Sequence, residues 1–206
     1  MTIHAADREA SERFYSTVLA TIEIDRTRRD GTRGEWLDFW VADADAEHSA
    51  TRGLHIGFVA PSRAHVDEFW RVGTEAGYRD DGAPGPRPEY GSDYYGSFLL
   101  DPDGNSAEAV HHDSLREGGA VDHLWIRVAE LDASKLFYET IAPKGGFRLS
   151  RDWPERAQFK GKSGSFSVVL GRPTENAHLA FHATGESESV IDPDGNTVEL
   201  VGLSPA

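Results

Sequence analysis

Two stretches of this chain have nearly the same sequence, and they decide its fold. The first is Phe98-Leu99-Leu100-Asp101-Pro102-Asp103-Gly104-Asn105-Ser106-Ala107-Glu108, and the second is Ser189-Val190-Ile191-Asp192-Pro193-Asp194-Gly195-Asn196-Thr197-Val198-Glu199. In each stretch an apolar segment precedes Asp-Pro-Asp-Gly-Asn, and a segment of alternating polar and apolar residues follows it. Proline fixes one turn dihedral and glycine tolerates a positive φ, so each stretch predicts a β-hairpin. Each returning strand carries a glutamate, and Val198 and Leu200 beside Glu199 point to the opposite face.

Other stretches repeat as well. Ala10-Ser11-Glu12-Arg13-Phe14-Tyr15 matches Ala133-Ser134-Lys135-Leu136-Phe137-Tyr138, and Leu54-His55-Ile56-Gly57-Phe58 matches Ala177-His178-Leu179-Ala180-Phe181. Both of these pairs are 123 residues apart, whereas the two hairpins are only 91 apart. We therefore interpret the chain as two copies of one unit, the second of which lacks 32 residues between its histidine strand and its hairpin.

The order of predicted elements within one copy is strand, helix, three strands, then the same again. In the first copy we expect strands over 1–6, 36–41, 54–60, 94–100 and 106–111, helices from an N-cap at Asp7 and over 62–76, a turn at Asp30-Gly31, and a loop over 84–88. In the second copy we expect strands over 121–128, near 148 and 158, and over 166–170 and 177–182, and one helix over 131–140. Only a few residues separate Ala183 from Ile191, too few for a second helix and its following strand.

This order predicts an α+β protein built of tandem βαβββ modules, with the second domain truncated. We expect a first domain over residues 1–112 with two such modules, a polar linker over 113–119, and a second domain over 120–206 that lacks its second helix.

Composition narrows the class of partner. The 206 residues carry a net charge of −14 and no cysteine, and 38% of them are hydrophobic. An acidic surface keeps a protein soluble and repels nucleic acid and anionic membranes, so we expect neither as a partner. The charge could also favour a cationic ligand, although solubility alone accounts for it. We expect the partner to be a small-molecule substrate or ligand. No apolar run approaches the ~18 residues of a membrane span, and no signal-peptide pattern opens the chain, so we expect a cytoplasmic protein.

Two imidazoles and a carboxylate on three strands of the second copy suggest a metal site. His123, His178 and Glu199 would leave coordination positions open, which suits Fe(II), Mn(II), Ni(II) or Zn(II). Strand alternation places Arg127 on the face of His123 and His182 on the face of His178. Arg127 could hold an anionic substrate group, and His182 could act as a fourth ligand or a proton shuttle. The plainer interpretation is three unrelated polar residues.

The first copy offers His55 and Glu108 in the corresponding places, but its counterpart of His123 falls before Met1. His4 lies four residues further along that strand, ~13 Å from the required place, and we expect it to be partly exposed. Asp38 is a possible third ligand. We interpret His112 as a solvated strand end, and Tyr90 as an ordinary loop residue, with a lid over the pocket as its alternative role.

Taken together, these stretches resemble the vicinal oxygen chelate superfamily, which includes glyoxalase I, bleomycin-resistance proteins and extradiol dioxygenases. The resemblance rests on the three repeated stretches quoted above and on Val121-Asp122-His123. It implies paired βαβββ modules whose mixed sheets curl into a cup around a metal. It also implies metal ligands on the first, fifth and last strands. The implied ligands are His123, His178 and Glu199 in the second domain, and His55 and Glu108 in the first.

Three functional hypotheses follow from this resemblance. The first is a divalent-metal-dependent lyase or dioxygenase acting on a small oxygenated molecule. The second is a metal-free binding protein, similar to bleomycin-resistance proteins, for a small aromatic or cationic ligand, with Trp36, Trp40, Tyr94 and Tyr95 lining its pocket. In the third, the second domain only completes the fold or a homodimer interface, since the deletion would leave sheet edges exposed.

Overall fold

A computed structural model describes residues 1–27, 33–116, 118–162 and 164–202, and the turn predicted at Asp30-Gly31 lies outside them. The elements of the N-terminal half are β1 (Thr2–Ala5), α1 (Arg8–Leu19), the short helix η1 (Ala20–Ile22), β2 (Arg33–Trp36), β3 (Phe39–Asp43), β4 (His55–Val59), α2 (Arg63–Glu75), β5 (Arg79–Pro86), β6 (Tyr95–Leu100) and β7 (Ser106–His111). Those of the C-terminal half are β8 (Val121–Val128), α3 (Leu131–Gly145), β9 (Phe147–Trp153), β10 (Arg156–Gly161), β11 (Gly164–Leu170), β12 (His178–Ala183), β13 (Glu188–Ile191) and β14 (Thr197–Gly202).

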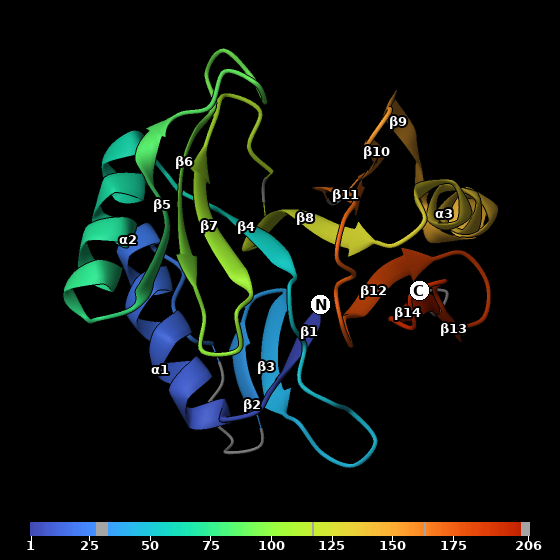
Figure 1. Ribbon diagram of the computed structural model, residues 1–206, viewed down its shortest axis with the longest axis horizontal. Helices are drawn as coiled ribbons and strands as arrows, with labels where there is room; N and C mark the ends of the chain where they lie inside the picture. Colours follow the sequence, from blue (N-terminus) through green and yellow to red (C-terminus); the bar gives the residue numbers. More distant parts are fainter. Residues whose placement is uncertain (28–32, 117, 163, 203–206) are drawn as a thin grey trace.

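The strands form two mixed sheets, and each sheet takes strands from both halves of the chain (Figure 1). The larger sheet has the order β5-β6-β7-β4-β8-β11-β10-β9, and the smaller has the order β13-β14-β12-β1-β3-β2. In the larger sheet the halves meet where β4 pairs antiparallel with β8, and in the smaller where β1 pairs antiparallel with β12. The predicted α+β class with tandem modules is confirmed by this arrangement.

The two hairpins have the same hydrogen bonds. The Asp101 carboxylate accepts from the backbone N–H groups of Asp103 and Asn105, and the Asp192 carboxylate accepts from the equivalent groups of Asp194 and Asn196. The turn glycines have positive φ values of 87° and 90°, as the sequence predicts.

A buried tyrosine then ties each hairpin to a helix of the same half. The Tyr15 hydroxyl donates to Asp101 at 2.9 Å, and the Tyr138 hydroxyl donates to Asp192 at 3.1 Å. The repeat therefore extends to individual side-chain contacts within each half.

The helices cover the outer faces of the sheets, and α1 and α2 lie together beside the N-terminal half (Figure 1). Helix α1 begins at the predicted N-cap, where the Asp7 side chain accepts from the backbone N–H of Ala10 at 2.9 Å. Its apolar stripe of Phe14, Tyr15 and Val18 is fully buried. The helices pack their apolar sides on one face of each sheet, so polar residues can occupy the opposite face.

The structure corrects three predicted boundaries. The predicted strand 36–41 is two strands, because Leu37 adopts a left-handed φ of 56° and starts a tight turn. Pro84 lies inside β5 rather than in a loop; β5 is an edge strand with register shifts, where a missing N–H is tolerated. Helix α3 runs past the predicted end at residue 140 to Gly145 and stops at Gly146, whose φ is 68°.

The truncation of the second copy is also visible. Residues 184–187 connect β12 to β13 directly, where the first copy has α2 and β5 between β4 and β6. Among the described residues, no helix combines the length and apolar character needed to cross a membrane.

Candidate metal centre

Three neighbouring strands of the eight-stranded sheet bring two histidines and a glutamate together. Gly57 of β4 is in register with Glu108 of β7 on one side and with His123 of β8 on the other. His55 lies two residues before Gly57, and so on the same face of the sheet. Alternation and register together therefore place the side chains of His55, Glu108 and His123 at one point.

Their donor atoms converge closely. His55 Nε2 is 3.0 Å from Glu108 Oε2 and 3.3 Å from His123 Nε2, and His123 Nε2 is 3.3 Å from Glu108 Oε2. Among the described residues, these three side chains form a group that could hold a metal ion, since their donor atoms all lie within 4.8 Å of one another. All three are buried, with Glu108 only 1% exposed.

Further side chains hold these three in place. His55 Nδ1 lies 3.2 Å from Ser106 Oγ, and the Ser106 hydroxyl donates to Asp81 at 2.7 Å. Because the Ser106 proton is directed to Asp81, Ser106 Oγ is free to accept from His55 Nδ1–H. This tautomer leaves the lone pair of His55 Nε2 directed at the centre of the cluster.

His123 is held in the same way by a carboxylate. Asp122 Oδ2 lies 2.9 Å from His123 Nδ1 and 3.3 Å from His112 Nε2. Asp122 is the extra residue of a bulge: Gly57 pairs with His123, whereas Phe58 pairs with Val121. An imidazole whose outer nitrogen donates to a carboxylate is the usual arrangement at protein-bound metals.

The donor set fits a divalent metal ion. Two imidazole nitrogens and one carboxylate oxygen are the ligands of zinc and of non-haem iron, manganese or nickel sites with open positions. Lone pairs of His55, His123 and Glu108 that face one another within 3.3 Å repel unless a cation or shared protons lie between them.

The pKa shifts reflect the same crowding of charge. Burial alone would raise the pKa of Glu108, but hydrogen bonds from His123 and His55 outweigh burial and lower this pKa to about 2. Burial would lower the pKa of His123, but hydrogen bonds to Asp122 and Glu108 raise it to about 9. Burial dominates at His55 and lowers its pKa, against the opposing effect of Glu108. Without a metal, the cluster therefore holds its proton on His123.

Two glycines make room for the cluster. A Cβ atom at Gly57 would lie 2.5 Å from Nδ1 of His123 and still closer to Cε1 of that ring. A Cβ atom at Gly96 of β6 would collide with Oε1 of Glu108. Any side chain at these two positions would displace a donor group.

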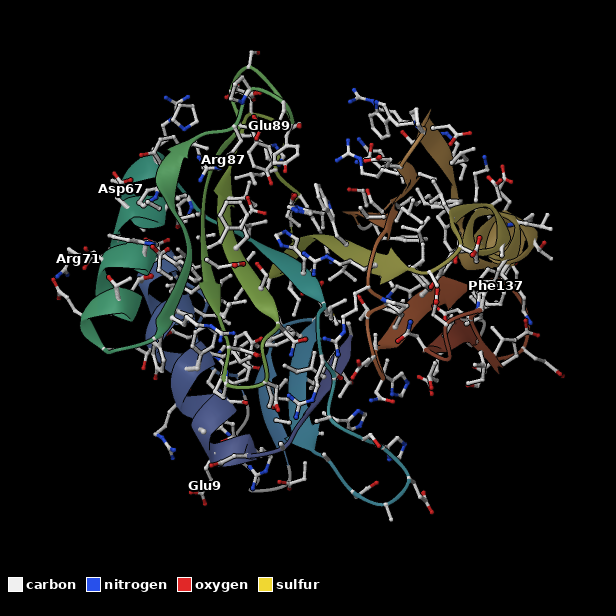
Figure 2. All side chains as sticks on the ribbon, viewed as in Figure 1. Glu9, Asp67, Arg71, Arg87, Glu89 and Phe137 are labelled. Atoms are coloured by element: carbon white, nitrogen blue, oxygen red, sulfur yellow. The ribbon has the colours of Figure 1, made fainter. Side chains whose placement is uncertain are left out.

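Aromatic side chains surround the cluster. The Tyr94 hydroxyl donates to Glu108 Oε1 at 2.8 Å, and the Trp125 ring centre is 5.5 Å from that of His55. Tyr90 connects these two, with ring centres 5.2 Å from Tyr94 and 5.4 Å from Trp125. Burial and the neighbouring Glu108 carboxylate raise the pKa of Tyr94, so this phenol keeps its proton. Figure 2 shows Arg87 and Glu89 in the segment that carries Tyr90, between the end of β5 and the start of β6.

The structure does not bring together the predicted set of His123, His178 and Glu199. His178 and Glu199 lie in the six-stranded sheet, where His178 Nε2 is 3.3 Å from Glu199 Oε2 and both side chains are partly exposed. The grouping fails because β8 pairs with β4 of the other half and not with β12. The side chain that the structure brings to His55 and Glu108 is therefore His123, and not Asp38.

The other predicted site residues are distributed between the two sheets. Arg127 lies four residues beyond His123 on β8, and its guanidinium donates to the Gly53 carbonyl at 3.1 Å. His182 is exposed on β12, in the other sheet. Asp38 accepts from the backbone N–H groups of Ala120 and Val121 and forms an ion pair with Arg116, away from the cluster.

Three of the remaining expectations are wrong. His4 is only 8% exposed, not partly exposed, and its ring stacks on that of His48 with centres 4.7 Å apart. His112 is not a solvated strand end, since its side chain is mostly buried against Asp122. Trp36, expected to line a pocket, is fully buried in the core, whereas Tyr95 donates to Asp67.

Sequence reasoning also missed residues that support the site. Strand alternation assigns Asp122 to the face opposite His123, and only the bulge brings its carboxylate to the His123 ring. Gly57 could have been recognised as a small residue two positions after a candidate ligand.

The fold and this site define a class of protein. The family model described as Glyoxalase/Bleomycin resistance protein/Dioxygenase superfamily matches residues 1–109, more than half of the chain, and the chain belongs to that superfamily.

One solved structure extends the likeness in fold over nearly the whole chain. Glyoxalase I from Zea mays is 17% identical with a TM-score of 0.64, over 98% of this chain and 90% of that one. A glyoxalase/bleomycin resistance protein from Albidiferax ferrireducens T118 is 28% identical with a TM-score of 0.49, over 54% of this chain and 96% of that one. None of the curated proteins matches the chain.

Proposed function

We propose that this protein is a divalent-metal-dependent enzyme, of the lyase or dioxygenase kind, that acts on a small molecule with two adjacent oxygen atoms. The observation that carries the proposal is the buried convergence of His55, Glu108 and His123 within 4.8 Å. A divalent metal bound there would supply Lewis acidity and open positions for two neighbouring substrate oxygens.

The surrounding residues suit such chemistry. Asp122 and Ser106 fix the orientation of the two imidazoles, so that both Nε2 atoms are presented to the centre. Tyr94 carries a proton at 2.8 Å from Glu108, where it can donate to an oxygen of a bound molecule. Burial of the three ligands keeps bulk water from the reacting atoms.

The test is the metal content of protein purified without chelator, measured by elemental analysis. We expect close to one transition metal per chain, and we expect His123→Ala and His55→Ala to lose it. The matched control is His178→Ala, which removes the equivalent histidine of the other sheet and should retain the metal. A wild-type chain that contains no metal and takes up none on titration would refute the proposal.

Activity then separates the two reaction classes. The iron-loaded protein should consume dioxygen with a catechol if it is a dioxygenase. It should rearrange an adduct of an α-oxoaldehyde and a thiol, without dioxygen, if it is a lyase. Loss of either activity in His123→Ala, with retention in His178→Ala, would assign that activity to this centre.

A metal-free binding protein is the second candidate. It is favoured by the fact that His55, Glu108 and His123 already contact one another directly and are enclosed by Tyr90, Tyr94 and Trp125. In that case the protein would bind an aromatic molecule beside these rings with equal affinity before and after treatment with chelator.

A further inference from the structure

One arginine lies among the aromatic rings beside the metal centre. Cζ of Arg156, on β10, is 4.0 Å from the ring centre of Trp153, 5.0 Å from that of Trp125 and 6.0 Å from that of Tyr90. Trp125 and Tyr90 are the rings that border His55 and Tyr94. The guanidinium is thus separated from the cluster by a single ring, and three aromatic contacts restrict its position.

Sheet register places this arginine on the same face as the metal centre. Val169 of β11 is paired with Arg156 on one side and with Arg127 of β8 on the other. Arg127 is two residues beyond Trp125 and four beyond His123, so alternation places all of them on one face. Lys160 joins this face, because it pairs through Ser165 with His123.

These cations have no acidic partners in the part of the chain that the structure describes. Ion pairs there engage other basic residues, and Arg127, Arg156 and Lys160 take part in none of them. In a chain with a net charge of −14, acidic side chains are plentiful, yet none of them pairs with these three cations, which form a local positive field beside the cluster. Such a field attracts an anion to the face that carries the cluster.

We propose that Arg156 determines specificity by binding an anionic group, a carboxylate, of a small oxygenated acid. The vicinal oxygens of that acid reach His55, Glu108 and His123, and its body lies against Trp125 and Tyr90. The proposal rests on the proposed function for the position of the vicinal oxygens. Planar guanidinium groups bind carboxylates through two parallel hydrogen bonds, and a guanidinium held by aromatic rings loses little freedom when it does so.

The test compares two probes that differ only in a carboxylate. Catechol and 3,4-dihydroxybenzoate both present adjacent oxygens, and their binding to cobalt-loaded protein is measured by calorimetry. We expect 3,4-dihydroxybenzoate to bind about tenfold more tightly than catechol, the effect of one charge-assisted hydrogen-bonded pair. In Arg156→Gln the preference for the acid should disappear, and Arg156→Lys should retain part of it.

Controls separate this inference from the proposed function. Arg13→Gln removes an arginine whose side chain is 65% exposed on α1 and should keep the preference. The same titration is run on chelator-treated protein, where the preference for the acid and its dependence on Arg156 should persist even if no metal binds. Equal affinities for the two probes in the wild type, or a preference that survives in Arg156→Gln, would overturn the inference.

Discussion

The substitution Gly57→Ala tests the geometry of the candidate metal centre without removing a candidate ligand. Gly57 sits between Glu108 and His123 in the sheet, and an added methyl group would lie 2.5 Å from His123 Nδ1. A carbon and a nitrogen atom in van der Waals contact are more than 3 Å apart, so the imidazole has to move. His123 is held by Asp122 on one side and Glu108 on the other, so it cannot move and keep both contacts.

The expected losses of stability and of metal affinity follow from the contacts that the His123 ring loses. Overpacking of a filled site costs typically about 1–3 kcal/mol of unfolding free energy. A displacement that breaks the contact between His123 and Asp122 has the effect of losing an outer-shell partner, which weakens metal binding roughly 10–100-fold. Gly57→Ala should therefore fold, be moderately less stable, and bind metal much more weakly.

The assay is a competition titration of Co²⁺ with a chelator of known affinity, together with a urea unfolding curve in excess chelator. Gly171→Ala is the matched control, because a Cβ atom there would be in ordinary contact, 3.5 Å from Arg127 Cδ. If Gly57→Ala bound Co²⁺ as tightly as the wild type, the close approach of His123 to β4 would not matter for the metal, and the reasoning would be wrong.

Three further predictions concern the same contacts. Asp122→Asn should weaken Co²⁺ binding roughly 10–100-fold with little change in fold, because the amide no longer attracts the proton of His123 Nδ1; unchanged affinity would contradict the role given to Asp122. Tyr15→Phe should lower the unfolding free energy by about 1–3 kcal/mol, because the Asp101 carboxylate keeps its burial and loses a donor; a shift below 0.5 kcal/mol in urea unfolding would argue against it. In excess chelator, unfolding free energy should be greatest between pH 4.5 and 6.5. Below pH 4.5 the stabilisation from Glu108, whose pKa is lowered to about 2, is lost as the pH falls. Above pH 6.5 the stabilisation from His123, whose pKa is raised to about 9, is lost as the pH rises through 9. A urea midpoint that does not change from pH 6.5 to 9, or that changes equally in His123→Gln, would refute the last prediction.

The sequence by itself determined the units of this protein. Its hairpins are fixed by short-range chemistry, since Pro102, Gly104 and the Asp101 side chain specify the turn whatever surrounds it. The same holds for the N-cap at Asp7, for the absent second helix, and for the face on which Glu108 lies. The repeat therefore predicted the α+β class, the superfamily and most of the candidate ligands.

Only the tertiary structure decided which ligands meet. Alternation gives the face of a strand, but the neighbour of a strand in a sheet depends on contacts between residues distant in sequence. The repeat suggested that each copy completes its own site, whereas β8 joins β4, so that His123 of the second copy completes the site of the first. Asp122 contacts His123 because of a bulge in β8. Arg156 shares the face of the site because β10, β11 and β8 pair in a particular register. Neither relation has a signature in local sequence.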